Sequence, residues 1–217
     1  TVKFFSTDLA GNAETVQSQL IQIDTAAPTT TVTCNSAACS AGWYKAAVTV
    51  RLSATDNQGG SGVGATYYTT NGSTPTTSST LYTGAFDVAS TTTVKFFSTD
   101  LAGNAEAVRS QLIQIDGAAP IVTLTNPANN SSFKWGTKIT VTAVATDQGS
   151  GSGNPSGIAQ VTIYLDGAVL AIDSSSPYSI PWNPNKKAVG THTLSAVATD
   201  AAGNSTTSGT VTVSITN

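Results

Sequence analysis

Apolar and polar residues alternate in short runs along most of the chain, and nearly every run ends in a turn sequence. From Val48 to Ala54, apolar residues occupy every second position, with Thr, Arg and Ser between them. A period of two predicts a half-buried β-strand. Further strands are predicted near residues 63–70, 139–145, 161–165, 194–198 and 211–215. Asn71-Gly72 and Asp166-Gly167 predict hairpin turns after two of these strands. Short strands separated by turn signals predict an all-β fold of tandem immunoglobulin/fibronectin III-like β-sandwiches.

One turn sequence recurs and sets the period of the chain. Thr-Asp-Leu-Ala-Gly-Asn stands at residues 7–12 and again at 99–104, and a close variant stands at 199–204. Around the first two copies, residues 1–24 and 93–116 align without a gap and differ at only two positions, Thr15 against Ala107 and Gln17 against Arg109. Such a match indicates duplication of one structural unit. Each copy is predicted to be a β-hairpin that closes a domain.

The repeat predicts the domain boundaries. We expect residues 1–24 to be the C-terminal hairpin of a preceding, truncated Ig-like repeat, 25–116 a first Ig-like domain and 117–217 a second. The short linkers from Asp24 to Pro28 and from Asp116 to Pro120 have prolines that favour an extended entry into the next strand. A lone hairpin is marginally stable in water, so we expect a neighbouring domain or another copy of the chain to cover residues 1–24.

Several motifs resemble known families of bacterial Ig-like domains. Tyr-Tyr-Thr-Thr-Asn-Gly-Ser-Thr-Pro at residues 67–75 resembles the strand-turn signature of the chitobiase/β-hexosaminidase C-terminal-like domain. Gly-Trp-Tyr at 42–44, Leu-Ser-Ala-Thr-Asp at 52–56 and the repeated turn are similar to OmpL47-type repeats. The second unit resembles a bacterial Ig-like domain through residues 164–167, 177–178 and 198–204. The resemblance implies a spacer or accessory module of a secreted or cell-surface bacterial protein, commonly beside glycoside hydrolases or adhesive regions.

The charge of the chain argues against nucleic-acid binding, and the length of its apolar runs argues against membrane insertion. Twelve acidic residues face nine basic ones, and the only adjacent basic pair is Lys186-Lys187. Nucleic-acid binding needs clustered basic residues, so no nucleic-acid partner is expected. No apolar run approaches the roughly 20 residues of a membrane-spanning helix, so no membrane insertion is expected.

The only two cysteines, Cys34 and Cys39, lie close together in a polar stretch. A zinc site needs about four ligands, and His192 is the only histidine that could join them. We therefore expect a Cys34–Cys39 disulfide, which implies an extracellular or cell-surface location.

No arrangement of residues predicts catalysis. His192 is expected on the surface-facing side of a strand, and Glu14 and Glu106, the only glutamates, are equivalent positions of the repeat. Neither a nucleophile–base set nor a carboxylate pair for glycoside hydrolysis stands out. The chain is expected not to be an enzyme, with no catalytic residue and no cofactor.

Calcium binding is the alternative to a purely structural role for the repeated aspartates and asparagines. Calcium takes six to eight oxygen ligands, while Asx turns use the same side chains to cap the backbone. We expect turn caps, with a calcium site at a domain junction as the alternative. The residues concerned are Asp56, Asn57, Asp100 and Asn104 in the first domain and Asp147, Asp200 and Asn204 in the second.

Aromatic residues are expected to pack in the cores, with a carbohydrate-binding platform as the alternative. They are Trp43, Tyr44, Tyr67, Tyr68 and Tyr82 in the first domain and Phe133, Trp135 and Trp182 in the second. Phe97 is an exception, since its neighbours Val94 and Phe96 are expected to face inward. Phe97 and its repeat mate Phe5 should then face outward, where they could mark a contact along the array or with a partner.

Together these features predict a non-catalytic stalk, spacer or structural module of a larger secreted or cell-surface bacterial protein. The alternatives are a carbohydrate-binding accessory module of a secreted glycoside hydrolase and a subunit of a surface fibre or layer. The expected partners are neighbouring domains of the same polypeptide, with cell-surface or extracellular polysaccharide and self-association as further possibilities.

Overall fold

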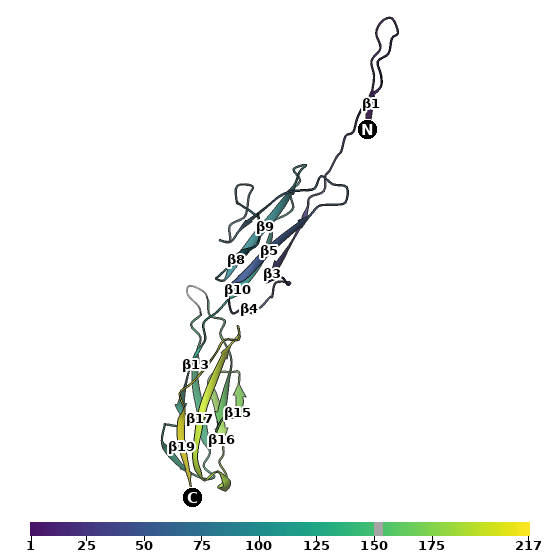
Figure 1. The fold of residues 1–217 in the computed structure, drawn as a ribbon. Helices are drawn as coiled ribbons and strands as arrows, with labels where there is room; N and C mark the ends of the chain where they lie inside the picture. Colours follow the sequence, from purple (N-terminus) through teal and green to yellow (C-terminus); the bar gives the residue numbers. More distant parts are fainter. Residues whose placement is uncertain (150–153) are drawn as a thin grey trace. The chain divides into compact units, whose positions relative to one another are not determined.

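The fold is all-β, as predicted, and is that of tandem immunoglobulin/fibronectin III-like sandwiches (Figure 1). A computed structural model describes residues 1–149 and 154–217. The chain divides into two compact units. One comprises Thr1–Val32, Arg51–Ala85 and Val94–Ser110, and the other comprises Thr33–Val50, Phe86–Thr93 and Gln111–Asn217.

Residues 1–116 form three sheets. Strands β1 and β2 make a two-stranded sheet of their own, β3, β5 and β8 make a second in that order, and the third has the order β4-β10-β9-β6-β7. The strands are β1 (Val2–Phe4), β2 (Gln17–Gln19), β3 (Thr29–Cys34), β4 (Trp43–Tyr44), β5 (Val48–Thr55), β6 (Val63–Thr69), β7 (Thr80–Leu81), β8 (Phe86–Val88), β9 (Thr92–Asp100) and β10 (Arg109–Ile115).

The described residues after 116 form two sheets, with the orders β11-β13-β16 and β12-β19-β17-β14-β15, and β18 pairs with β17. The strands are β11 (Ile121–Asn126), β12 (Ser131–Lys134), β13 (Ile139–Thr146), β14 (Ile158–Leu165), β15 (Ala168–Asp173), β16 (Tyr178–Trp182), β17 (Gly190–Asp200), β18 (Ser205–Thr207) and β19 (Val211–Thr216). A 3₁₀ turn, η1, spans Lys186–Ala188. No helix among the described residues has the length and apolar character needed to cross a membrane.

The predicted inward faces form the cores. In the second domain, Val141 on β13 and Ile163 on β14 are fully buried in one cluster, although their strands belong to different sheets. The cluster therefore lies between two sheets, as in a sandwich. Earlier in the chain, Val48, Val50, Val94 and Phe96 are buried as the alternation predicts.

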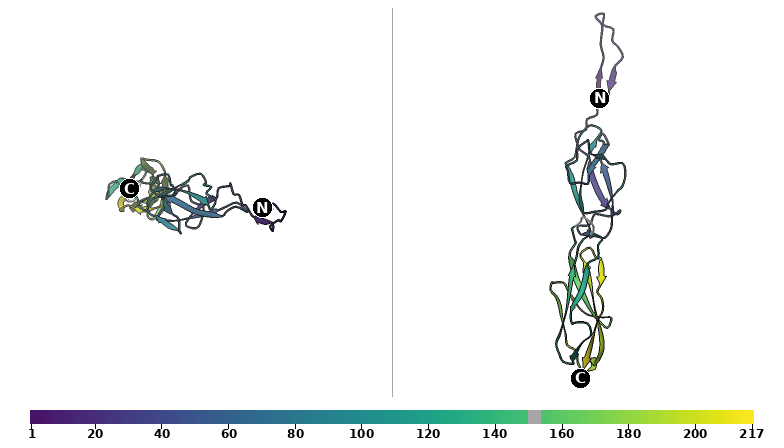
Figure 2. Two further views of the ribbon diagram at one scale, coloured as in Figure 1. Left: turned by 90° about the horizontal axis from the view of Figure 1, so that it is seen from above. Right: turned by 90° about the vertical axis from the view of Figure 1, so that its left-hand side faces the viewer.

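The two copies of the duplicated segment have the same fold but different surroundings. Strands β1 and β2 pair antiparallel with each other, Val2 opposite Gln19 and Phe4 opposite Gln17 (Figures 1 and 2). Every residue from 1 to 23 is exposed, whereas β9 and β10 supply buried residues to the first domain. The hairpin is therefore a local structure that forms in either environment.

Two turn predictions have different outcomes. Asp166-Gly167 joins β14 to β15, and both residues have positive φ, at 50° and 79°, as a type I′ hairpin turn requires. The prediction that Asn71-Gly72 makes a tight hairpin is wrong, because β6 ends at Thr69 and its antiparallel partner β7 begins only at Thr80. The Asn71 side chain instead accepts a hydrogen bond of 3.1 Å from the Ser73 amide, and the turn lies inside a longer loop.

Candidate functional site

The repeated turn is built by one aspartate and one asparagine. Oδ1 of Asp100 accepts the backbone N–H of Asn104 at 2.7 Å, and Oδ2 accepts the Asn104 side-chain amide at 2.7 Å. Asp200 and Asn204 make the same two bonds at 2.8 and 2.9 Å. Gly103 between them has a φ of +95°, which favours glycine. The sequence therefore folds this turn locally and presents its carboxylate in a fixed orientation.

In the first domain this turn meets two further carboxylates. Asp24, Asp56 and Asp100 place one carboxylate oxygen each within 4.8 Å of one another, and we call them the first carboxylate cluster. Oδ2 of Asp24 accepts the N–H of Ser61 at 2.7 Å, and Oδ2 of Asp56 accepts the N–H of Gly62 at 2.7 Å. Two neighbouring amides of one loop therefore bind two different aspartates.

The turn is also bonded to the linker backbone. The Asn104 side-chain amide donates to the carbonyl oxygen of Asp24 at 3.0 Å, and the N–H of Ala102 donates to Oγ of Ser61 at 3.1 Å. Three segments that are distant in sequence thus meet here: the linker, the loop before β6 and the hairpin turn after β9.

The second domain repeats this arrangement with different loop sequences. Asp116, Asp147 and Asp200 form the second carboxylate cluster, again with oxygens within 4.8 Å. Oδ2 of Asp116 accepts the N–H of Ser156 at 2.8 Å, and Oδ2 of Asp147 accepts the N–H of Gly157 at 2.7 Å. Each bond of the first cluster therefore has its counterpart in the second.

The linker contact is repeated as well. Asn204 donates from its side chain to the carbonyl oxygen of Asp116 at 2.9 Å, and Ala202 donates its N–H to Oγ of Ser156 at 3.2 Å. We call the set of carboxylate cluster, serine and asparagine a joint, the first joint being at Asp24 and the second at Asp116.

Every carboxylate oxygen of the two clusters accepts at least one N–H group. In the first cluster, Oδ1 of Asp24 accepts from Ala26 and Oδ1 of Asp56 accepts from Asn57, in addition to the bonds above. In the second, Oδ1 of Asp116 accepts from Ala118 and Oδ1 of Asp147 from Gly149. Hydrogen bonds to a carboxylate favour its charged form, so these N–H groups make it less unfavourable to place three carboxylates close together.

The linker aspartates show this effect in their pKa. The backbone N–H and hydroxyl of Ser61 lower the pKa of Asp24 below its ordinary value. Burial raises the pKa of Asp116, but the bonds from Ser156 outweigh it, and the net pKa is also lowered. Both linker carboxylates are therefore anionic at neutral pH.

Calcium is the metal ion that the clusters could hold. Three carboxylates, with backbone carbonyls nearby, are the hard oxygen donors that calcium prefers, although calcium needs six to eight of them. The same oxygens already cap loop amides, which is the turn-cap role expected from the sequence. The sequence singled out Asp56, Asp100 and Asn104 and their second-domain counterparts, and the structure brings these together. Asn57 contributes its backbone N–H to Asp56.

Sequence reasoning missed Asp24 and Asp116 as members of the clusters. Both follow the same tetrapeptide Leu-Ile-Gln-Ile at the end of a duplicated segment. An acidic residue kept at both linkers was the available signal. Ser61 and Ser156, each just before a glycine, were also missed.

His192 lies apart from the joints and is bonded on both sides of its ring. Nδ1 lies 2.6 Å from Oδ2 of Asp166 and Nε2 lies 2.7 Å from the carbonyl oxygen of Ala188. Its ring also meets Trp182 edge-on, with centroids 5.5 Å apart. The side chain is only 17% exposed, so the surface-facing position expected from the sequence is wrong. Burial lowers the pKa of His192, but the bonds to Asp166 and Ala188 outweigh it and raise the pKa overall.

Cys34 and Cys39 are joined by a disulfide in the structure. Cys34 is the last residue of β3, and its N–H and carbonyl also pair with Ala37. The bond therefore closes a small loop at the end of a strand.

The aromatic residues do not form an exposed row. Trp43, Tyr44, Tyr67, Tyr68, Tyr82 and Phe133 are half-buried, Trp182 is buried, and Trp135 is exposed. Phe97 is only 7% exposed because the ring of Tyr67 on β6 stacks on it at 5.5 Å, so the expectation that Phe97 is exposed is wrong. Its repeat mate Phe5 is 58% exposed, as expected.

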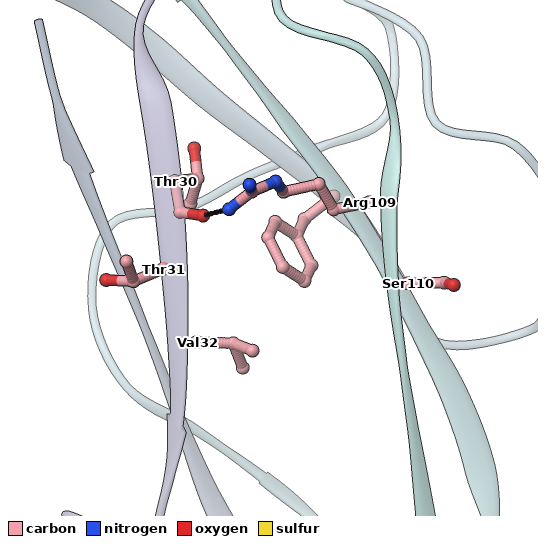
Figure 3. A pocket seen from close by; sticks show the side chains of 6 residues that line it. Thr30, Thr31, Val32, Arg109 and Ser110 are labelled. Carbon is pink, nitrogen blue, oxygen red and sulfur yellow. Dashed lines mark hydrogen bonds between the residues drawn. The ribbon is translucent and has the colours of Figure 1, made fainter. Parts of the chain in front are cut away.

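An open groove of about 510 Å³ lies beside β3 and β10, lined by Thr30, Thr31, Val32, Phe96, Arg109 and Ser110 (Figure 3). The Arg109 guanidinium reaches across it and donates to the carbonyl oxygen of Thr30. Its Nε also lies 3.9 Å from Oε2 of Glu106. Because the Arg109 guanidinium already interacts with Thr30 and Glu106, less of its positive charge is available to a ligand in the groove.

Comparison with solved structures finds Ig-like and fibronectin III-like proteins among those similar to this chain. Fibronectin(III)-like modules of Clostridium thermocellum CbhA are 23% identical, with a TM-score of 0.38 over 44% of this chain and 94% of theirs. The D1-D2 structure of Rst is 12% identical (TM-score 0.48, 80% of this chain and 93% of that one). The D00-D0 domains of intimin are 14% identical (TM-score 0.37, 84% and 99%). No curated protein matches the sequence.

Two family models match consecutive parts of the chain. Residues 39–110 match the chitobiase/beta-hexosaminidase C-terminal domain, and residues 120–196 match the bacterial Ig domain. Of the two resemblances considered for the first unit, the family model supports the chitobiase type. Both are Ig-like families without catalytic function of their own. The chain therefore carries a chitobiase/β-hexosaminidase C-terminal domain followed by a bacterial Ig domain.

Proposed function

We propose that the chain is a non-catalytic stalk or spacer of a larger secreted or cell-surface bacterial protein. In such a protein, tandem Ig-like modules position an enzymatic or adhesive part. The observation that carries the proposal is that the same joint is built twice, at Asp24 and at Asp116, although the loops around the two joints have diverged in sequence. A set of hydrogen bonds that recurs at successive linkers has its role in connecting the modules.

The joint bonds the linker to the module that follows it. Asp116 accepts from Ser156 through its side chain and from Asn204 through its carbonyl oxygen, and it is fully buried. Linkers between domains are ordinarily exposed and flexible. A linker residue held at both its side chain and its backbone supports a spacer that resists cleavage between modules.

We propose the boundaries that the repeat predicts, with a closing hairpin at 1–24 and Ig-like domains at 25–116 and 117–217. The disulfide and the bacterial Ig family support an extracellular or surface location. The partly buried aromatic residues favour the spacer over a carbohydrate-binding module, because stacking on sugars needs exposed ring faces.

Two measurements test the proposal. The chain is mixed with insoluble chitin, cellulose and peptidoglycan, and it is expected to stay in the supernatant after centrifugation. Retention on one polysaccharide would replace the spacer with the carbohydrate-binding alternative.

In the second measurement, limited proteolysis compares the natural chain with Asp116→Ala. The substitution removes the acceptors of Ser156 and Ala118 and should expose residues 117–120 to cleavage. Asp8→Ala, in the exposed copy of the turn, is the matched control and should leave that linker resistant. Equal cleavage of the two variants would count against a joint that protects the linker.

A further inference from the structure

One hairpin sequence faces water in one copy and a protein core in the other. Phe96 is 2% exposed, whereas its mate Phe4 is 54% exposed, and Ile115 is 3% exposed against 82% for Ile23. Eight large apolar residues of the first copy are exposed, and those whose mates in the second copy are buried are Val2, Phe4, Phe5, Ile21 and Ile23. The mates of the other three, Leu101, Val108 and Leu112, are exposed as well. A group of exposed apolar side chains ordinarily marks an interaction site, and the second copy shows what covers five of them.

The exposed hairpin already has the conformation of the buried one. The N–H of Glu14 donates to the carbonyl oxygen of Ser6 at 3.0 Å, and the N–H of Glu106 donates to that of Ser98 at 3.1 Å. Isolated bridges join Thr7 to Ala13 in one copy and Thr99 to Ala105 in the other. A preorganised element binds without the cost of ordering its backbone.

The buried copy is recognised by polar groups as well as by apolar packing. Oε2 of Glu106 accepts the N–H of Thr30 at 3.1 Å, and Oε1 accepts both the Thr30 hydroxyl and the N–H of Ser98. The Ser98 hydroxyl lies 2.6 Å from that of Thr30 and 2.7 Å from that of Thr66. Two threonines of the domain thus satisfy a serine and a carboxylate of the hairpin in its interior.

The turn end makes a third contact of this kind. Ala102 donates its N–H to Oγ of Ser61, whereas its mate Ala10 donates to its own neighbour, Oδ1 of Asp8, at 2.9 Å. The exposed copy keeps Ser6 and Glu14 at the positions of Ser98 and Glu106. It therefore retains the groups that a scaffold with two threonines and a loop serine would bind.

We propose that hairpin β1–β2 closes a further Ig-like sandwich whose other strands stand ahead of Thr1 in the same polypeptide. The order follows from the second copy, in which the scaffold strands β3 to β8 precede the hairpin that completes them. That sandwich has two threonines, equivalent to Thr30 and Thr66, that hydrogen-bond to Glu14 and Ser6. It also has a serine, equivalent to Ser61, whose hydroxyl accepts the N–H of Ala10. The inference rests on the repeat organisation of the proposed spacer and identifies one of its module contacts.

Hydrogen exchange measured by mass spectrometry on two forms of the protein tests this proposal. In the chain of 217 residues, amides 2–19 should exchange rapidly. In the complete polypeptide made by its source, the same amides should exchange at least ~100-fold more slowly, at every protein concentration. A polypeptide that begins at Thr1, or equal exchange in both forms, would overturn the proposal. Protection that disappears on dilution would also overturn it, since a second copy would then be the occupant.

A pair of variants in the complete polypeptide tests the polar contacts. Glu14→Ala should lower the protection of amides 2–19 by roughly tenfold or more, because the scaffold donors lose a buried acceptor. Thr15→Ala is the matched control, since the second copy has Ala107 at that position, and it should leave protection unchanged. Equal protection in both variants would overturn the assignment of Glu14. Neither result bears on polysaccharide binding or linker cleavage, so failure here is distinguishable from failure of the spacer.

Discussion

The side-chain amide of Asn204 donates a hydrogen bond of 2.9 Å to the backbone carbonyl of Asp116, the residue that follows strand β10. The same amide donates to Oδ2 of Asp200 at 2.9 Å. Asp116 and Asp200 are both almost fully buried. One asparagine therefore satisfies two buried acceptors, one in the linker and one in the hairpin turn.

Asn204→Ala is expected to lower the free energy of unfolding by about 2 kcal/mol, because buried acceptors that lose a donor cost roughly 1–3 kcal/mol. Urea titration followed by tryptophan fluorescence measures the change. Asn12→Ala removes the same turn bond from the exposed copy, where water replaces it, and should change stability by less than about 0.5 kcal/mol. Equal effects would show that the linker and burial contribute nothing beyond the turn itself.

Phe97 and Phe5 offer a second matched pair. Phe97→Ser should destabilise the first domain by about 3 kcal/mol, because it removes a buried ring stacked on Tyr67. Phe5→Ser replaces an exposed ring and should be nearly neutral. Thermal unfolding of both variants gives the comparison. A neutral Phe97→Ser would mean that the ring does not pack as the structure shows.

The case of Phe97 shows how far the sequence could predict this fold. Alternation within β9 predicts correctly that Val94 and Phe96 face the core. It says nothing about which side chain of a neighbouring strand lies over the other face. Tyr67, on β6, covers Phe97, and that contact depends on the pairing of Tyr67 with Phe97 across two strands.

The joints were predictable only in part for a related reason. The turn at Asp100 and Asn104 is local, so its sequence identifies it. Asp24 acts through Ser61, which is distant in sequence and lies in a loop without periodicity. An Ile-Asp pair stands at the start of both linkers, but it identifies the partner of the aspartate only once the position of the loop is known.

The hydrogen bonds of His192 predict that stability decreases as the pH rises above the unfolded pKa of histidine, about 6.5. Both ring nitrogens face acceptors, Asp166 Oδ2 and the carbonyl oxygen of Ala188, so the doubly protonated ring satisfies both. The pKa of His192 is raised in the folded protein. Its stabilising contribution is therefore complete below the unfolded pKa of about 6.5 and is lost as the pH rises through the folded pKa.

Urea titrations of the natural chain and of His192→Gln at a series of pH values from mildly acidic to mildly alkaline measure this contribution. The natural chain should lose more stability than the variant across the series, since glutamine does not titrate. Parallel curves would show that protonation of the His192 ring contributes nothing to stability.

Calcium provides the test of what the carboxylate clusters do. Asp24, Asp56 and Asp100 bring oxygens within 4.8 Å of one another, but each of their carboxylate oxygens already accepts an N–H group that holds a loop or a turn. The carboxylates of the first cluster therefore cap loop and turn amides. The unfolding midpoint measured by calorimetry should accordingly be the same in millimolar calcium as in chelator. A ligand that binds only the folded state raises that midpoint, so an increase with calcium that disappears in Asp56→Asn would identify the clusters as metal sites and the spacer as one stabilised by calcium.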